Sequence, residues 1–413
     1  MNNRVDSRAL FGSWLLFSVG ASLCGCDSAA PPVTPHDGGG SDAGTQDAGP
    51  AYDGGGCEPR PDDYTPRVSA SSTDTWPACI TDTATTYPRI STDIGSVARV
   101  AAFDNMFAPM FGGVPGVLYG PERDPTTAEF LQAREIYQTP EGIESRINRR
   151  PDTHYAEPAR PASCVDEYVC RCYDVAAANA DYCTGPALLK PVVMASLNQG
   201  ITGDPSEASR IYAARVDAAL EWTFYLSSFK ESLTCDSDTA DCDSAWGYYT
   251  GGEERGGGLG LARLVRALEP GTHDRIWDGL LAVRCWRDLD TAIPPANVPL
   301  QMRARGQQDA ALIRGMIAII EDRLRSLSTT TGVVREAHLA WLRVLLAPIP
   351  EHTINDGLGM DFTVPAHASL VDRTIRVVDA ASADFIATEI VKAPDAIDVG
   401  AIVTRLNDAY PCP

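Results

Sequence analysis

The chain has 413 residues, 44% of them apolar, so it is long enough for two ordinary domains or for one large domain with a sizeable core. Its formal net charge is −21, from 55 acidic and 34 basic residues. An acidic surface of this kind repels nucleic acid and anionic lipid headgroups, so the composition argues against a nucleic acid as partner of the folded body.

Residues 1–25 have the layout of an export signal. Arg4 and Arg8 form a short basic region, and residues 9–23 form an apolar run. A run of this length is typical of a secretory signal and is short for a membrane-spanning helix. We therefore expect the protein to be exported, either to the periplasmic face of a cell envelope or to the cell surface.

The end of this segment resembles the signal of bacterial lipoproteins. Those signals read Leu-x-Gly/Ala/Ser-Cys, and cleavage occurs just before the cysteine, which becomes lipidated. Leu23-Cys24-Gly25-Cys26 matches this pattern with Cys26 as the acceptor. The rival frame ends at Cys24 and puts the bulky Leu23 where a small residue is expected, and an ordinary cleaved signal peptide is a further alternative. The resemblance implies attachment to a membrane through an N-terminal lipid.

The number of downstream cysteines favours Cys26 as the lipidated residue. If Cys24 carried the lipid, Cys26 would remain as an odd thiol in an oxidising compartment. The pairing stays open, with Cys57–Cys79, Cys235–Cys242 and a pair within 164–183 as short-loop candidates. A zinc site is the alternative for the four cysteines of that last cluster. An even set of ten cysteines follows Cys26, namely Cys57, Cys79, Cys164, Cys170, Cys172, Cys183, Cys235, Cys242, Cys285 and Cys412.

Residues 26–56 comprise the lipidation cysteine and a linker. The stretch 27–56 is rich in Gly, Asp and Pro and has almost no apolar side chains, so it cannot bury a core. As a flexible coil it would span about 30 Å, which suits a tether between a lipid and a folded body. Residues 57–95, rich in Pro, Thr, Ser and Asp, predict an irregular segment held together by disulfides.

Helical periodicity dominates from residue 96 onward. Start signals occur at Asp124-Pro125, Asp204-Pro205 and Thr272, and Pro270-Gly271 is expected to end a helix. The predicted helices cover 96–111, 124–137, 204–233, 261–268, 273–290, 301–327, 333–347, 369–391 and 397–408. No β-hairpin pattern has comparable strength. We therefore predict an all-α fold of helical bundles with a disulfide-stapled irregular N-terminal segment. Residues 96–413 form the helical domain, and if it contains two bundles we expect the break near 190–205.

No common catalytic motif is intact in the sequence. His-Glu-x-x-His, Gly-x-Ser-x-Gly and the phosphate-binding loop are all absent. The Gly-rich stretch 248–264 leads into a predicted helix, whose N-terminal N–H groups could hold an anion. It lacks the Lys-Ser/Thr of a phosphate loop and carries Glu253 and Glu254. A mobile loop between helices is therefore the favoured interpretation.

Three other regions with histidines suggest ligand or metal sites. His154 lies in a segment with the basic cluster of the chain and with acidic and tyrosine side chains, which suggests a polar binding site, although a solvated charged turn is favoured. His338 lies on the apolar face of its helix, where a hydrogen-bonded core histidine is the default. A third group surrounds the stretch 355–361 and could bind a metal ion. The side chains involved are Arg146, Arg149, Arg150, Asp152, Tyr155 and Glu157 in the first region, and Glu351, His352, Asp356, Asp361 and His367 in the third.

His273 carries a resemblance to a known family. Exported, lipid-anchored, all-helical proteins of the imelysin type contain Gly-x-His-x-x-Glu. Gly271-Thr272-His273 is similar to its first half, with Ile276 in place of the glutamate. The stretch 243–252 and the pair 312–324 and 335–346 are loosely similar to the same superfamily. The resemblance covers about residues 200–390 and implies a two-bundle periplasmic fold with a role in iron-linked uptake or proteolysis.

Three hypotheses about function follow. The leading one is a non-enzymatic, lipid-anchored helical protein that binds a ligand or a protein partner, with no cofactor predicted. The second is an imelysin-like metal-dependent peptidase or a metal-uptake protein, with a metal ion held by His273, His338 and carboxylates. The third is a structural protein of the envelope, which a high disulfide content suits. Convergence of His273 and His338 in one acidic pocket would favour the second.

Overall fold

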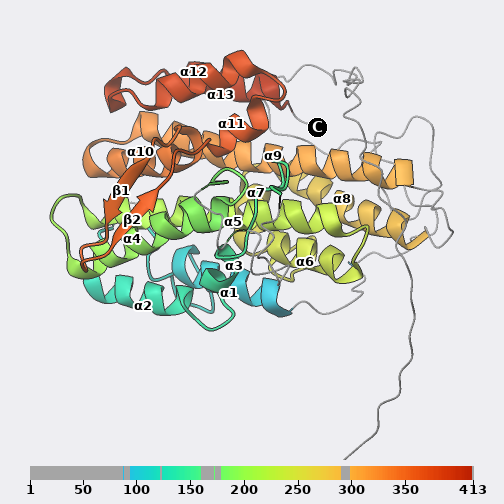
Figure 1. The fold of residues 1–413 in the computed structure, drawn as a ribbon, viewed down its shortest axis with the longest axis horizontal. Coiled ribbons are helices and arrows are strands. Elements are labelled where there is room, and N and C mark those ends of the chain that lie inside the picture. Colours follow the sequence, from blue (N-terminus) through green and yellow to red (C-terminus); the bar gives the residue numbers. More distant parts are fainter. Residues whose placement is uncertain are drawn as a thin grey trace, which may run out of the picture. The chain divides into compact units, whose positions relative to one another are not determined.

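The computed structural model describes Tyr87, Cys172 and residues 94–120, 123–159, 178–289 and 298–411. These residues form thirteen α-helices, two short helical turns (Gly185–Leu189 and Pro394–Ala396) and one two-stranded sheet, which confirms the all-α prediction (Figure 1). The helices are α1 (Ile94–Phe107), α2 (Thr127–Tyr137), α3 (Ile143–Ile147), α4 (Lys190–Thr202), α5 (Ser209–Thr234), α6 (Thr239–Thr250), α7 (Gly260–Leu268), α8 (Pro270–Leu289), α9 (Val298–Thr329), α10 (Gly332–Leu346), α11 (Leu370–Ile375), α12 (Ala380–Ile390) and α13 (Val399–Ala409).

Helix α5 is the centre of the fold. It packs against α4, α6 and α10, and 18 of its 26 residues are buried. In Figure 1 it lies between α9 and α10 on one side and α1, α2 and α6 on the other. A helix covered on several sides needs no single apolar stripe. The consequence is that Asp217, Glu221 and Glu231, all on α5, are carried into the interior.

The region of the proposed break between bundles is occupied by α4. One continuous hydrophobic core contains side chains from both sides of it, including Phe130 of α2 and Leu345 of α10. Across the part of the chain that the structure describes, no helix combines the length and apolar character needed to cross a membrane.

Several helices begin at residues other than those that the start signals predicted. Thr126, not Asp124, caps α2, because its hydroxyl accepts from Glu129 N while the Glu129 carboxylate accepts from Thr126 N. Asp204 makes a turn with Ser206 N, so α5 begins five residues later. Pro270 opens α8 instead of closing α7, as expected for a residue without an N–H in a first turn.

The sheet is a small hairpin in a region where no hairpin was predicted from the sequence. Strand β1 (His352–Asn355) pairs antiparallel with β2 (Asp361–Val364), with His352 opposite Val364. Asp356 closes the turn, because one of its carboxylate oxygens accepts from Leu358 N at 2.8 Å and Met360 N at 2.9 Å. Asn198 of α4 donates to the other oxygen at 3.0 Å, which fastens the hairpin to the helices.

Two disulfides fall where short loops were expected. Cys235–Cys242 joins the end of α5 to α6, and Cys172–Cys183 lies within the 164–183 cluster. Because Cys172 and Cys183 are bonded to each other, the zinc interpretation of that cluster is wrong. Cys285 is disulfide-bonded as well. The predictions for the other cysteines lie outside the described residues: Cys26, Cys57, Cys79, Cys164, Cys170 and Cys412.

One arginine of the basic cluster before Pro151 lies in the interior of the protein. Arg150 is 1% exposed and donates to Glu231 of α5, also buried, at 3.0 Å. Lys230 Nζ lies 2.7 Å from the other oxygen of Glu231. Burial alone would raise the pKa of Glu231, but Arg150, Lys230 and Arg146 lower it to about 2. The solvated charged turn favoured from the sequence is therefore wrong for Arg150, although its neighbour Arg149 is exposed.

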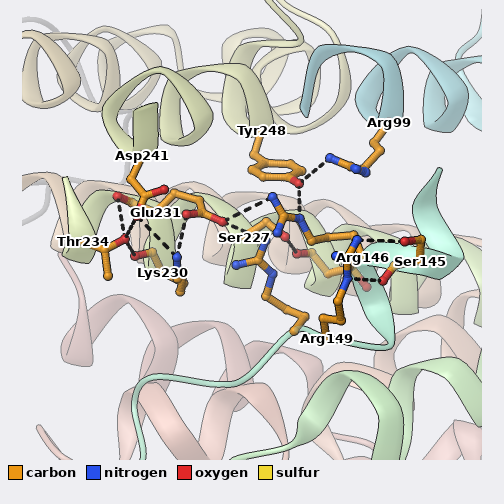
Figure 2. A network of polar contacts seen from close by, with 12 residues as sticks. Arg99, Ser145, Arg146, Arg149, Ser227, Lys230, Glu231, Thr234, Asp241 and Tyr248 are labelled. Atoms are coloured by element: carbon orange, nitrogen blue, oxygen red, sulfur yellow. Dashed lines mark hydrogen bonds and ion pairs between the residues drawn. The ribbon is translucent and has the colours of Figure 1, made fainter. Parts of the chain in front are cut away.

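Tyr248 of α6 joins this cluster to the first helix. Its hydroxyl accepts from Arg99 of α1 at 2.9 Å and from Arg146 of α3 at 2.5 Å, and Figure 2 shows the two arginines meeting at that oxygen. The guanidinium of Arg99 also donates to the carbonyl of Glu141, just before α3. The network therefore fastens α1, α3, α5 and α6 to one another through buried or half-buried charges.

Candidate functional site

The strongest candidate site is a cavity of about 400 Å³ among α1, α5, α7, α9 and α10. Its walls are partly aromatic, with Phe103 and Phe107 from α1 and Trp341 from α10. Its polar lining includes two carboxyl groups of α5 and arginines from α7 and α9. This size, and this mixture of aromatic walls with a few polar groups, are typical of sites that take small molecules.

Asp217 and Glu221 place two carboxyl groups side by side on the cavity wall. They are four residues apart on α5 and therefore share one face of the helix. Both are buried, and Glu221 is only 1% exposed. Arg323 of α9 donates to Asp217 at 2.9 Å. Among the described residues, the Glu221 Oε2 atom is buried without a hydrogen-bond partner.

The two carboxyl groups have unusual proton affinities. Burial, and then the charge of Asp217, raise the pKa of Glu221 well above 4.5 in spite of two nearby arginines. Burial also raises the pKa of Asp217, although Arg323 acts in the opposite direction. Because the charge of Asp217 raises the pKa of Glu221, the pair retains a proton to a higher pH than two exposed carboxyl groups would. A carboxyl group of this kind can donate a proton to a bound molecule or become its counter-ion.

Arg263 brings a second ion pair to the cavity. It donates to Asp104 of α1 at 3.1 Å, and Asp104 is fully buried. Both oxygens of Asp104 also accept from Gly260 N, the first residue of α7, at 3.2 Å. Asp104 therefore occupies the place at this helix N-terminus where the sequence suggested that an external anion could bind.

His338 is the one histidine of the three predicted site residues that lines the cavity. It lies one helical turn from Trp341 on α10, is 5% exposed, and accepts or donates no hydrogen bond among the described residues. Burial, and then the charge of Arg323, lower its pKa to about 4. At neutral pH it therefore offers an uncharged imidazole that can donate or accept a hydrogen bond.

His273 and His154 lie elsewhere, and their nitrogens are occupied. His273 Nε2 lies 2.9 Å from the carbonyl of Arg255, so Nε2 carries the proton and Nδ1 accepts from Tyr249 at 3.0 Å. His154 Nδ1 lies 2.6 Å from Asp152, and its Nε2 lies 3.1 Å from the Tyr225 hydroxyl. The structure therefore does not bring His273 and His338 into one pocket.

The family motif and the metal hypothesis find no geometric counterpart within the described residues. Ile276, which stands where the imelysin-type motif has its glutamate, is fully buried in the core. His352 Nδ1 lies against the carbonyl of Pro350, and Asp356 is used in the hairpin turn. Nowhere in 94–120, 123–159, 178–289 or 298–411 do three His, Cys, Asp or Glu side chains form a group that could hold a metal ion.

Asp217, Glu221, Arg263 and Arg323 were not among the site residues predicted from the sequence. A local signal for the first two was present, since "VDAALEW" (216–222) places acids at i and i+4 directly after the apolar Val216 and Leu220. Acids beside the apolar stripe of a long helix indicate buried carboxyl groups. No local signal pairs Asp217 with Arg323, 106 residues away, because that pairing exists only in the packed fold.

We expect Glu221→Gln to raise the free energy of unfolding by about 0.5–2 kcal/mol at pH 8, and less at pH 4. The folded protein holds the pKa of Glu221 above its unfolded value of 4.5, so stability falls as the pH rises above that value. Glutamine has no proton to retain and escapes this loss. Urea unfolding at the two pH values measures the effect.

The matched control for this measurement is Glu135→Gln, which changes an exposed glutamate of α2. Equal stability of the Glu221→Gln and wild-type proteins at pH 8 would contradict a proton-retaining Glu221.

Comparison of this protein with protein-family models, curated proteins and solved structures finds no match. A function for this protein is therefore inferred from the cavity itself.

Proposed function

We propose that this is an exported, lipid-anchored protein that binds a small molecule in the cavity between α5, α9 and α10. The single observation that carries the binding function is the cavity, in which no other described residue gives Oε2 of the buried Glu221 a hydrogen-bond partner. A buried, unpaired carboxyl oxygen destabilises a protein, so its presence requires another explanation. Binding of a ligand is such an explanation. The export signal and the linker support a location at a membrane surface.

Filling the cavity tests the binding function. Ala214 of α5 lines the cavity, so Ala214→Phe should occupy part of its volume. A library of small molecules is screened by thermal shift against the full-length protein in detergent. We expect molecules that raise the Tm of the wild-type protein and not that of Ala214→Phe. Ala381→Phe, at an exposed alanine of α12, is the control. Molecules that stabilise all three proteins equally would show binding outside the cavity.

Lipid attachment is tested separately with two neighbouring cysteines. We expect Cys26→Ser to abolish incorporation of labelled palmitate and Cys24→Ser to leave it intact, because the cysteine after Gly25 is the acceptor in the proposed signal. Mass spectrometry of the mature N-terminus identifies the modified residue. Lipid on Cys24, or an unmodified N-terminus at another residue, would contradict the proposed anchor.

Acid catalysis is the second candidate function, favoured by the proton that the Asp217–Glu221 pair retains. Under this alternative a molecule found by the screen would be converted to a product by the wild-type protein. Glu221→Gln would abolish the conversion, and the Asp217→Asn variant would slow it. Recovery of the unchanged molecule after long incubation would favour binding alone.

A further inference from the structure

We infer that the cavity is built for an organic cation with an apolar body, such as a primary amine or a quaternary ammonium compound, with Glu221 as its counter-ion. This inference rests on the proposed binding function and specifies its ligand class.

The arginines at the cavity are already neutralised. Arg323 of α9 is paired with Asp217 at 2.9 Å, and Arg263 of α7 is paired with Asp104 at 3.1 Å. Arg210, at the start of α5, is paired with Asp124 at 2.7 Å. Each of these arginines is balanced by a carboxylate, and breaking a buried pair to free one for an anionic ligand costs about 3–5 kcal/mol. Arg263 Nε, which is buried without a hydrogen-bond partner among the described residues, remains a donor for a polar ligand atom.

The remaining groups are acidic or neutral. Glu221 has no ion-pair partner in the described structure, and neither does Asp322 of α9, which also lines the cavity. His338 is uncharged at neutral pH, since burial, and then Arg323, hold its pKa at about 4. Ionised Glu221 and Asp322 would therefore give the cavity a net charge of −2, which a cationic ligand would offset.

The walls suit the apolar part of such a ligand. Phe103 and Phe107 are buried on one side of the cavity, and Tyr119, which is 39% exposed, also lines it. Aromatic rings attract ammonium groups and pack against alkyl or aryl chains. A fully hydrated inorganic cation would gain little from such walls.

Release of the Glu221 proton on binding distinguishes a cationic ligand from a neutral one. Burial, and then the charge of Asp217, raise the pKa of Glu221 in the free protein, so Glu221 keeps its proton to a higher pH than an exposed glutamate does, whereas a bound cation favours the ionised form. Cation binding therefore displaces the proton, and affinity rises with pH until the carboxyl group is ionised in the free protein. A neutral ligand of the same shape would displace no proton.

Three probes of one shape test the inference: 2-phenylethylamine, 2-phenylethanol and 3-phenylpropanoate. Calorimetry with the full-length protein in detergent, in two buffers of different ionisation enthalpy, measures affinity and proton release. We expect the amine to bind about tenfold or more tightly than the alcohol, with release of a proton. We expect Glu221→Gln to remove that preference and the proton release, and Glu135→Gln to retain both.

The outcomes separate this inference from the proposed function. Stronger binding of the alcohol or of the acid, abolished by Ala214→Phe, would overturn the organic cation and leave small-molecule binding in place. Failure of all three probes, together with a thermal-shift screen that finds no cavity ligand, would overturn both. Amine binding that Glu221→Gln leaves unchanged would overturn the assignment of the counter-ion.

Discussion

Glu231→Gln is expected to lower the free energy of unfolding by about 3–5 kcal/mol. Glu231 is the carboxylate shared by Arg150 and Lys230, and the guanidinium of Arg150 is 1% exposed. Glutamine keeps the shape and removes the charge, so Arg150 would be buried without compensation. Burial already lowers the pKa of Arg150, and Glu231 is the main group that opposes this effect. Unfolding in urea, an uncharged denaturant, measures the change in the free energy of unfolding with the disulfides intact.

Glu141→Gln is the matched control for this substitution. Glu141 lies 3.2 Å from Arg149, but its side chain is 80% exposed, so its loss should change stability by only about 0–1 kcal/mol. The double variant Glu231→Gln/Arg150→Met should recover part of the loss, since it removes the uncompensated charge. Equal effects of Glu231→Gln and Glu141→Gln would show that the Arg150–Glu231 pair contributes no more than a surface contact.

The same network predicts sensitivity to acid. The pKa of Glu231 is lowered from 4.5 to about 2 in the folded protein, where Arg150, Lys230 and Arg146 overcome the effect of burial. A carboxyl group with a lowered pKa stabilises the fold above its unfolded pKa, and this contribution is lost as the pH falls from 4.5 towards 2. Glu231→Gln should therefore flatten the pH dependence of stability in that range.

Helices with an apolar stripe could be predicted from the sequence, and helices held by tertiary contacts could not. The sequence from 301 to 327 repeats apolar residues at helical spacing, and α9 follows it closely. Helix α6, "TADCDSAWGYYT", has no such stripe. Its Gly247 packs so closely on Ser96 of α1 that a Cβ atom there would clash with the serine side chain. The partner 151 residues away, not the local sequence, fixes this helix.

The candidate site shows the same limit. Histidines were selected from the sequence because they are common ligands, yet His154 and His273 use both nitrogens in hydrogen bonds inside the fold. The acids of α5 and the arginines of α7 and α9 belong to separate helices. Only their packing around a cavity leaves an oxygen of Glu221 unpaired among the described residues. The spacing of apolar residues in the sequence does not say which helix faces pack against each other.

Substitution of two buried, uncharged histidines is expected to have a large effect on the pH dependence of the free energy of unfolding. His367 is 5% exposed, and neither ring nitrogen has a hydrogen-bond partner in the part of the chain that the structure describes. Its backbone is fixed by paired hydrogen bonds with Ile349, at 2.8 and 3.0 Å. Burial, and then the nearby Arg373, lower the pKa of His367 to about 3, while Asp152 acts in the opposite direction. His338, in the cavity, is shifted in the same sense to about 4.

For such a histidine the unfolded chain binds a proton below pH 6.5 that the folded protein does not bind, so its contribution to stability falls as the pH falls. Each histidine should contribute a slope of about 1.4 kcal/mol per pH unit between pH 6.5 and 4. The carboxyl groups with raised pKa values act in the opposite sense, so the difference between the wild-type and variant proteins is the useful quantity.

We expect His338→Gln/His367→Gln to change the slope of unfolding free energy against pH by about 2.7 kcal/mol per unit. His352→Gln, which removes an exposed imidazole from the hairpin, is the control. Parallel curves for the wild-type and double-variant proteins would mean that both rings become protonated in the folded state, which their burial and the proximity of Arg323 and Arg373 oppose.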